Sequence, residues 1–532
     1  MNHIIYDMLV VLLYFAVILV VGFLLSRKHK KDSASDFLTG GRSLNWVKTG
    51  LTLIAMAIDT GIMGVAGIGF VWGLAIQPNA LNLWVSAPLA AMFLVPIYWR
   101  SKIVTTPELL EKRFSVHSRS LFSGLMILYN VIVLGTSIYL GGLILETIFG
   151  WNLLLACSVI MAIVGLYVMM GGMKTVLAIN IYQAVFITLT LIAVGTMCIV
   201  QAGGFSVLLN SPVESAAGAP LASTMFPFDL SLKSDLWYAM PSGIIWGALA
   251  GTAWIACNFG MVQRLLAAKD EQNAQKAILF TGAGHVFTFF FAYVVGISIK
   301  ILHPELAKAD ESYVYAVLNF FPVGVRGLLI AGLIASLVST IDGLLTSSGT
   351  LMTRDIFLRF FKPGADDRTI KRFARIVQAV VLILAFFIIP VAAREQTVTR
   401  LIQDLISIPL GVMVALYLVG VFSTRATPWA AFIGALAGTL VAVLIYFVYP
   451  DINFLNRGIL GFLTVVVTTV LLSFFEKRPS VESLENLTVF TLKGVKGPWV
   501  GQGSWRNLWK WLLFIIGGWF VLVAVWELLL VR

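Results

Sequence analysis

Cysteine and charge are both scarce in this sequence. Among 532 residues there are three cysteines, and 12% of the residues are charged, whereas 59% are hydrophobic. The mean hydropathy is +0.93. So much apolar surface cannot be buried in the core of a soluble protein of this length. The composition therefore indicates an integral membrane protein that crosses the bilayer many times.

The sequence also lacks the motifs of several enzyme classes. Cys157, Cys198 and Cys257 all fall within apolar stretches, where a small buried side chain is expected rather than a disulfide or a metal ligand. The five histidines form no HExxH spacing, and neither a GxSxG elbow nor a P-loop occurs. These absences argue against a protease, an ATP-driven pump and enzymes in general. A transporter of small solutes is the class that remains.

Long apolar runs divide the chain into about 14 candidate membrane helices, each with roughly the 20 residues needed to cross a bilayer. They predict an all-α integral membrane protein. The first run lacks the Lys or Arg of a signal peptide at its amino end and is expected to stay as an anchor. The candidates lie near residues 4–26, 49–74, 80–99, 119–147, 151–171, 174–201, 236–262, 276–301, 326–352, 372–393, 397–421, 427–449, 456–475 and 508–530.

The basic residues predict how these spans are oriented. Most of the 37 Lys and Arg residues fall in the connections that follow odd-numbered spans. Because such residues gather on the cytoplasmic side, the amino terminus is expected outside, and an even number of spans returns Arg532 to the outside as well. We expect a multi-pass protein of the plasma membrane. The net charge of +11 then reflects topology and contact with membrane lipid, not binding of nucleic acid.

Two spans that lie five positions apart, 49–74 and 236–262, are both interrupted by glycine. Broken helices at matching positions predict two inverted five-helix repeats with a binding site at the membrane midplane. Close packing of helices through small residues is the alternative, above all for the second span. The glycines are Gly61, Gly64, Gly67, Gly69 and Gly73 in the first span, and Gly243, Gly247 and Gly251 in the second.

This pattern predicts one membrane domain with five parts. An extra helix and a basic inside loop are followed by the first repeat, an outside loop, the second repeat and three additional helices with an inside loop. The boundaries are 1–48, 49–201, 202–235, 236–421 and 422–532.

One span combines hydroxyl groups with a carboxylate. A carboxylate at the centre of a membrane helix costs about 2.5 to 3.5 kcal/mol, so Asp342 requires a compensating cation, partner or water path. Sodium prefers oxygen ligands, and a broken helix nearby would supply carbonyl oxygens. Alternatively, each hydroxyl bonds back to a carbonyl of its own preceding turn. The hydroxyl residues are Ser336, Ser339, Thr340, Thr346, Ser347 and Ser348.

Several stretches in the same order resemble the sodium/solute symporter family, which contains sodium-coupled sugar, proline and sialic acid transporters. The resemblance covers most of the chain and implies a neurotransmitter:sodium symporter-like fold, with spans 2 to 11 as its ten core helices. It runs from Asp36–Arg42 (DFLTGGR) to about Phe422, and its most specific segments are Thr106–Phe114 (TPELLEKRF), Gln263–Lys269 (QRLLAAK), and Val338–Thr340 followed by Ser347–Ile356.

The resemblance implies a sodium site at the break of span 2. Its ligands would be the hydroxyls of Ser339 and Thr340 and the carbonyls of Ser336, Ile54 and Ala57. Na⁺ is thus the expected coupling ion.

The family's second sodium site uses an aspartate on the fifth core helix. Here Asn180 stands at that position, and the carboxylate of Asp342 lies on the eighth core helix instead. The hypothesis is that Asp342 and Asn180 face each other, and either hold a second cation or form a neutral structural pair.

The expected solute is small and polar, with a sugar or polyol favoured. By resemblance, Asn258 and Gln403 stand at amide positions that contact sugar hydroxyls, and His285 stands where a lysine occurs. His285 is equally a candidate for a neutral core histidine. The residues Asp59, Thr60 and Gly61 follow the predicted sodium carbonyls, and Asp59 suits the amine of a cationic or zwitterionic solute.

Sodium-coupled import by alternating access is therefore the predicted function. The alternatives are a sodium-coupled amino acid or amine transporter, a proton-coupled carrier, and a non-transporting sensor with the same fold. The expected partners are a small polar solute, sodium and membrane lipid, and the sequence does not indicate an oligomeric state.

Overall fold

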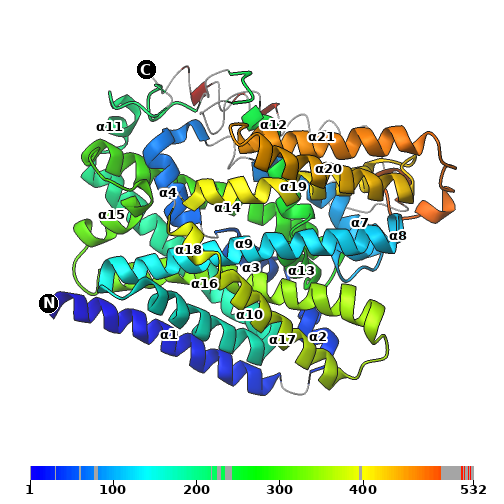
Figure 1. The fold of residues 1–532 in the computed structure, drawn as a ribbon. Helices are drawn as coiled ribbons and strands as arrows, with labels where there is room; N and C mark the ends of the chain where they lie inside the picture. The colour runs from blue at the N-terminus through cyan, green and yellow to red at the C-terminus, as the bar shows by residue number, and fades with distance from the viewer. Residues whose placement is uncertain are drawn as a thin grey trace.

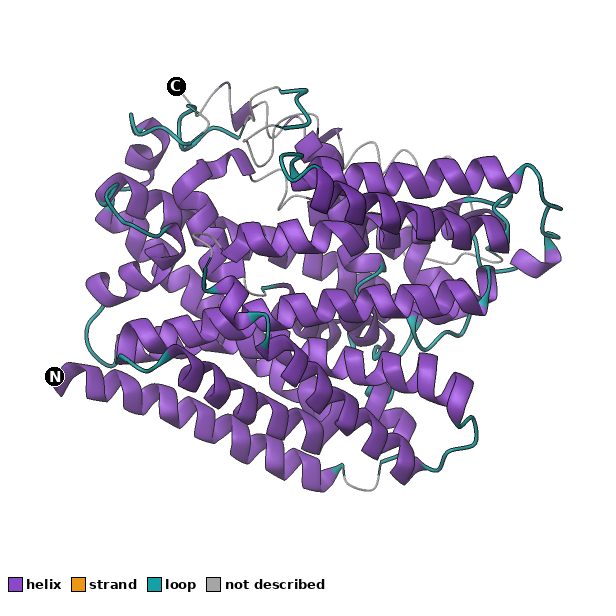
Figure 2. Ribbon diagram, viewed as in Figure 1, coloured by secondary structure: helices purple, strands orange, loops and turns teal. Residues whose placement is uncertain are grey.

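The computed structural model of the chain is a helical bundle. It describes residues 2–492 apart from 30–31, 59–60, 77–81, 217, 225–228, 234–241 and 395–397, together with 517–518, 521, 525–526 and 528. Within this described part, helices and loops are present and no strand is formed (Figure 2). The prediction of an all-α protein is confirmed.

The predicted apolar runs correspond to helices in the structure. The helices of the first half are α1 (Asn2–Lys28), α2 (Ala34–Thr39), α3 (Trp46–Ala57), α4 (Gly61–Trp72), η1 (Gly73–Ile76), α6 (Asn82–Leu89), η2 (Ala90–Leu94), α7 (Val95–Arg100), α8 (Thr106–Arg113), α9 (Val116–Phe149), α10 (Leu153–Gln201) and α11 (Phe205–Asn210). Those of the second half are α12 (Ser242–Ala256), α13 (Phe259–Leu266), α14 (Glu271–Leu302), η3 (Ala309–Glu311), α15 (Ser312–Phe320), α16 (Val325–Leu351), η4 (Met352–Phe361), α17 (Asp367–Phe386), α18 (Ile389–Ala392), α19 (Val398–Phe422), α20 (Pro428–Val448), α21 (Phe454–Ser473), η5 (Glu482–Leu484) and η6 (Val489–Thr491).

Nine of the described helices are long and apolar enough to cross a membrane, and two bent pairs raise the number to eleven. The helix α10 corresponds to two predicted spans, because it has 49 residues and breaks at Gly172. The third predicted span corresponds to α6, η2 and α7 in succession. The fourteenth, 508–530, lies almost entirely outside the described residues.

Spans 2 and 7 are both broken, but not at most of their glycines. The axes of α3 and α4 differ by 58°, and those of α12 and α13 by 47°. Gly67 and Gly69 lie inside α4, where a methyl group would collide with Asp310 and with the backbone of Tyr293. These two glycines therefore serve close packing. Likewise, Gly243, Gly247 and Gly251 all lie within the continuous helix α12.

The break between α12 and α13 is stabilised by polar groups. The hydroxyl of Tyr98 donates to the carbonyl of Ala256 at the end of α12, over 2.9 Å. Asn258 caps α13, because its side chain accepts a hydrogen bond from the backbone N–H of Gly260. Both contacts satisfy backbone groups that a helix end would otherwise leave unpaired in a membrane. Polar side chains thus support the bend between α12 and α13.

Helix α16 occupies the centre of the bundle. Every residue from 329 to 351 is buried. Helices α9 and α10 both pack against it, and α1 lies along α10 and α16 on one flank of the molecule (Figure 1). The pair α20 and α21 lies on the opposite flank (Figure 1). The hydroxyl-rich span is therefore the most enclosed of the long apolar helices in the described structure.

Ion pairs link the connections that are predicted to lie on the inner side of the membrane. Lys174, at the turn within α10, pairs with Asp32 in the loop after α1 at 2.8 Å and with Asp36 in α2 at 3.0 Å. Arg100, after α7, pairs with Glu271 at the start of α14 at 3.1 Å.

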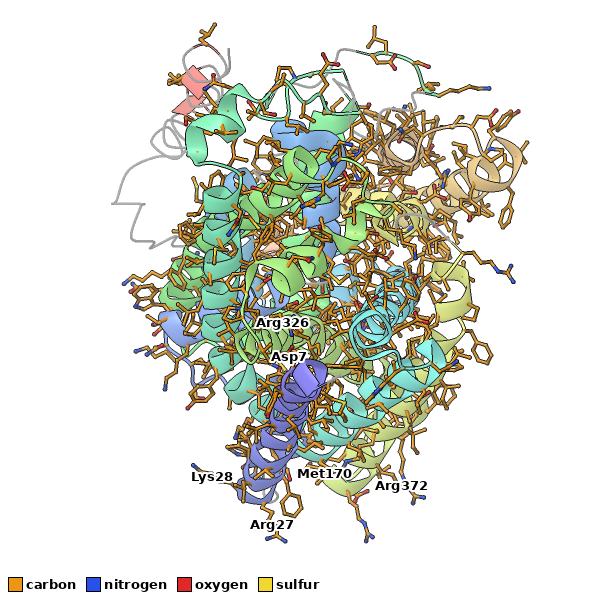
Figure 3. All side chains as sticks on the ribbon, turned by 90° about the vertical axis from the view of Figure 1, so that its left-hand side faces the viewer. Asp7, Arg27, Lys28, Met170, Arg326 and Arg372 are labelled. Carbon is orange, nitrogen blue, oxygen red and sulfur yellow. The ribbon has the colours of Figure 1, made fainter. Side chains whose placement is uncertain are left out.

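Connections predicted to lie outside are joined in the same way. Asp7 near the amino end pairs with Arg326 at 3.0 Å, and the two residues lie beside each other in Figure 3. Lys233 pairs with Asp451 at 3.3 Å. These contacts agree with the predicted division of the loops into two groups, one at each membrane face.

Candidate functional site

The hydroxyl of Ser339 lies at the end of α3, where span 2 breaks. Its Oγ is 2.7 Å from the carbonyl oxygen of Ala55 and 2.7 Å from that of Ser336. The Oγ1 of Thr340 is 3.3 Å from the same Ser336 carbonyl. The three hydroxyl-bearing residues are between 0% and 2% exposed. Four oxygen atoms from two helices therefore form a buried cluster.

The hydroxyls of Ser339 and Thr340 make three close oxygen–oxygen contacts but carry only two protons between them. A serine hydroxyl carries one proton and donates to one acceptor at a time. One of the two 2.7 Å contacts of Ser339 therefore brings two oxygen lone pairs together without an intervening hydrogen. A hard cation with oxygen ligands would turn both contacts into favourable ones. Groups of three or more His, Cys, Asp or Glu that suit a transition metal are absent from the described residues.

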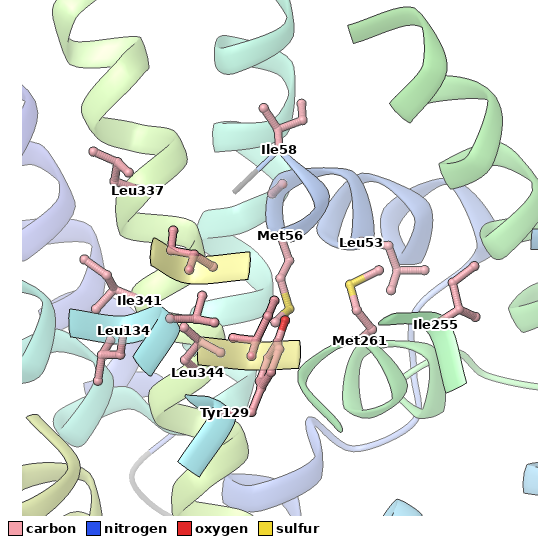
Figure 4. Close-up of a cluster of buried hydrophobic side chains, with 14 of the residues drawn as sticks. Leu53, Met56, Ile58, Tyr129, Leu134, Ile255, Met261, Leu337, Ile341 and Leu344 are labelled. Carbon is pink, nitrogen blue, oxygen red and sulfur yellow. The ribbon is translucent and has the colours of Figure 1, made fainter. Parts of the chain in front are cut away.

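The carbonyl that contacts Ser339 belongs to Ala55, which the sequence analysis did not include. The carbonyl of Ile54 accepts the capping hydrogen bond from the N–H of Ile58, at 2.9 Å. Ala57 is the last residue of α3. The end of α3, with Met56 and Ile58, lies between α16 and α13 (Figure 4).

The remaining hydroxyls of α16 have other partners. The side chain of Asn130, on α9, donates to Ser347 and Ser348 at 3.0 and 2.9 Å. Thr346 donates to the carbonyl of Asp342 in its own helix, at 2.9 Å. These three hydroxyls hold helices together or satisfy the local backbone, so the part of the candidate ion cluster on α16 is confined to Ser336, Ser339 and Thr340.

Asp342 is fully buried and has three partners. Its Oδ2 accepts from the hydroxyl of Tyr167 at 2.6 Å, and its Oδ1 forms an ion pair with Nη2 of Arg264 at 3.1 Å. Asn180 lies against the same carboxylate. The structure thus brings Asp342 and Asn180 together as expected, and it adds a buried cation that the sequence analysis did not assign to them.

Sequence reasoning missed Arg264 because it follows an apolar run, where basic residues normally mark a cytoplasmic loop. The break at Asn258 starts a second helix, α13, which keeps the chain in the interior. Arg264 is 0% exposed as a result. Arg264 lies within Gln263–Lys269, one of the segments that resemble the family, and this was the signal in the sequence that could have identified it.

The predicted solute residues are spread over several elements. Asn258 is 5% exposed, and its amide oxygen is used in capping α13. His285, on α14, is 6% exposed, lies 3.8 Å from Phe289 and 5.9 Å from Trp254 between ring centres, and leaves Nδ1 without a hydrogen-bond partner. Gln403, in α19, is half-buried.

The remaining three predicted contacts follow α3 in the sequence. Gly61 is the first residue of α4. Asp59 and Thr60 lie outside the described residues. Gly284, the residue before His285, packs against Ile54 of α3.

Comparison with known proteins places the chain in a family. A sequence model of the sodium:solute symporter family matches residues 37–438. The sodium/glucose cotransporter of Vibrio parahaemolyticus is 28% identical over 506 residues, which cover 89% of this chain and 91% of that protein. The human sodium/myo-inositol cotransporter is 25% identical over 547 residues, covering 92% and 76% respectively.

Solved structures agree on the fold. A Na⁺-coupled sialic acid symporter in a substrate-bound, outward-open state superposes with a TM-score of 0.76 at 20% identity, over 89% of this chain and 99% of that one. MhsT in complex with L-phenylalanine gives a TM-score of 0.52 at 13% identity, over 81% and 99%. The symporter-like fold predicted from the sequence is confirmed. With three quarters of its length matched by the family model, the chain belongs to the sodium:solute symporter family.

Proposed function

We propose that this chain is a sodium-coupled symporter that imports a small polar solute, a sugar or a polyol, across the plasma membrane. Both termini lie outside in this proposal, and the protein is a transporter and not an enzyme. The observation that supports it most strongly is the oxygen cluster in which Ser339 of α16 meets the carbonyl of Ala55 at the break of span 2. Sodium binds there, held by Ser339, Thr340 and the neighbouring carbonyls.

The position of this cluster suggests how the ion couples to the solute. Helix α3 ends at Ala57, and α4 begins at Gly61 in a different direction. An ion that bridges α16 and the end of α3 fixes the first half of the broken span relative to the bundle. Coupling requires that the ion favour one arrangement of the helices over the others. In this proposal sodium favours the outward-open arrangement and orders the break for the solute.

The energy available from sodium is sufficient for accumulation. Entry of one positive charge across 100 mV supplies about 2.3 kcal/mol. A tenfold concentration gradient adds about 1.4 kcal/mol. One sodium ion per cycle therefore supports a solute gradient of several hundredfold.

The solute class is supported by two relatives and by the kind of residues predicted to contact the solute. The relatives are named for glucose and for myo-inositol, which are both uncharged and rich in hydroxyl groups. Asn258, His285 and Gln403 are uncharged polar side chains of the type that bind such groups. We propose that they contact the solute together with Asp59, Thr60 and Gly61.

Uptake into proteoliposomes tests the function. We expect an inward sodium gradient to drive accumulation of labelled glucose or myo-inositol, whereas an equal potassium gradient does not. The Ser339→Ala/Thr340→Ala variant should lose the sodium dependence. Uptake driven by a proton gradient without sodium would favour a proton-coupled carrier instead. Transport of proline or choline in preference to both polyhydroxylated solutes would favour the amino acid or amine alternative.

A further inference from the structure

The carboxylate of Asp342 is surrounded by hydrogen-bond donors. Oδ2 accepts from Tyr167 at 2.6 Å, and Oδ1 accepts from Arg264 at 3.1 Å. Both members of the ion pair have side chains that are 0% exposed. A cation site requires oxygen lone pairs that point inward. The carboxylate oxygens of Asp342 already use their lone pairs to accept hydrogen bonds from Tyr167 and Arg264.

The amide of Asn180 completes this arrangement. In the orientation that satisfies both of its ends, its nitrogen donates to Oδ2 of Asp342 and to Oε1 of Gln183, both at 2.9 Å. Its oxygen accepts from Nη2 of Arg264 at 2.8 Å. Gln183 in turn donates to the hydroxyl of Tyr14 on α1, at 3.0 Å. The two oxygen-bearing side chains proposed for a second cation therefore both accept hydrogen bonds from one guanidinium group.

The backbone of α16 makes room for this guanidinium. A Cβ atom at Gly343 would lie 2.9 Å from Nη1 and 3.0 Å from Nη2 of Arg264. The other side of the group is held by the carbonyl of Gly260, which accepts from Nη1 at 3.1 Å. Arg264 thus occupies a defined position between α13 and α16, directly beside the residue that carries the charge.

We propose that Arg264 is a tethered cation that takes the place of a second sodium ion, so that this chain binds a single sodium ion, at Ser339 and Thr340. The pair of Arg264 and Asp342 is electrically neutral without an ion, and a further cation at the carboxylate would leave an uncompensated positive charge in the interior. An arginine is always protonated and cannot leave during the transport cycle. The inference rests on the proposed sodium-coupled function and specifies its stoichiometry.

Equilibrium binding of radioactive sodium to the purified protein tests this proposal. The wild type is expected to bind one sodium ion per chain, and Ser339→Ala/Thr340→Ala none. Removal of the tethered charge in Arg264→Gln should open a second sodium site, which raises the number bound to two. Arg264→Gln/Asp342→Asn should return it to one, because no net charge then remains to attract an ion.

The outcomes separate this inference from the function it rests on. Two ions on the wild type, or an unchanged count on folded Arg264→Gln, would overturn the tethered-cation proposal and leave sodium-coupled transport standing. A wild type that binds no sodium would instead overturn the proposed function. If Arg264→Gln cannot be purified, the count on the wild type still tests the proposal, because two bound ions would overturn it.

Discussion

Ser339 and Asp342 lie three residues apart on α16 and stand in opposite electrostatic surroundings. Ser339 meets two carbonyl oxygens with a single proton to share. Asp342 meets an arginine, a tyrosine and an amide, all of which donate to it. A bound cation would relieve the oxygen–oxygen contacts at Ser339, whereas Arg264 already neutralises the carboxylate of Asp342. The residue chemistry thus distinguishes two positions that look equally suited to sodium in the sequence.

Gly343 provides a direct test of the ion pair. In Gly343→Ala the new methyl group would lie about 3 Å from both terminal nitrogens of Arg264 and force them away from Asp342. Overpacking of this kind typically costs about 1 to 3 kcal/mol. We expect a lower free energy of unfolding, measured by thermal or denaturant unfolding in detergent.

Gly124 is a matched control for this variant. It also lies within a helix, α9, but a Cβ atom there would meet nothing within 4 Å. Gly124→Ala should leave stability unchanged or raise it slightly, because alanine favours helix more than glycine does. Equal stability of Gly343→Ala and Gly124→Ala would contradict the packing described for Arg264.

At the scale of elements, broken helices position the site. The end of α3 exposes the Ala55 carbonyl to Ser339, and the break before α13 carries Arg264 back into the interior. The sequence indicated that spans 2 and 7 are unusual, but most of their glycines lie inside continuous helices. The break between α12 and α13 depends on capping by Asn258 and on the hydroxyl of Tyr98, which is 158 residues away from the carbonyl it satisfies. Such distant partners leave no local pattern in the sequence.

The turn within α10 requires glycine for its backbone conformation. Gly172 has φ of 62° and ψ of −168°, a region that other residues avoid. A Cβ atom would also collide with the ring of Phe37. Gly172→Ala should lower the free energy of unfolding by more than about 1 kcal/mol. Gly150→Ala is a useful comparison, since it has positive φ but nothing within 4 Å. A larger loss at Gly150 than at Gly172 would refute the role of the Phe37 contact.

At the scale of the whole molecule, hydropathy predicted the class and most of the membrane helices. These predictions succeeded because burial in lipid demands long apolar helices. The second-site hypothesis was less complete, since Arg264 is adjacent to Asp342 in space and 78 residues away in sequence. The contact of Ala55 with Ser339 likewise depends on the register of two packed helices. Neither the contact of Arg264 with Asp342 nor that of Ala55 with Ser339 can be derived from the composition of a single span.

Engineered cysteines would establish which membrane face is outside. The native Cys157, Cys198 and Cys257 are all 0% exposed and should react slowly with polar thiol reagents. Asp451→Cys should be labelled in intact cells by an impermeant reagent, because its loop belongs to the predicted outside group. Gly364→Cys, in an exposed loop of the inside group, should react only after permeabilisation. The reverse pattern would invert the proposed topology.

The most direct test of the central claim is the thermal stability of the purified protein in sodium compared with potassium at equal ionic strength. Sodium at ten times its dissociation constant should stabilise the wild type by about 1.4 kcal/mol. The Ser339→Ala/Thr340→Ala variant should lose this shift, whereas Ser336→Ala should retain it, because Ser336 contributes its backbone carbonyl. An equal sodium shift in the wild type and the Ser339→Ala/Thr340→Ala variant would contradict the assignment of the ion to this cluster.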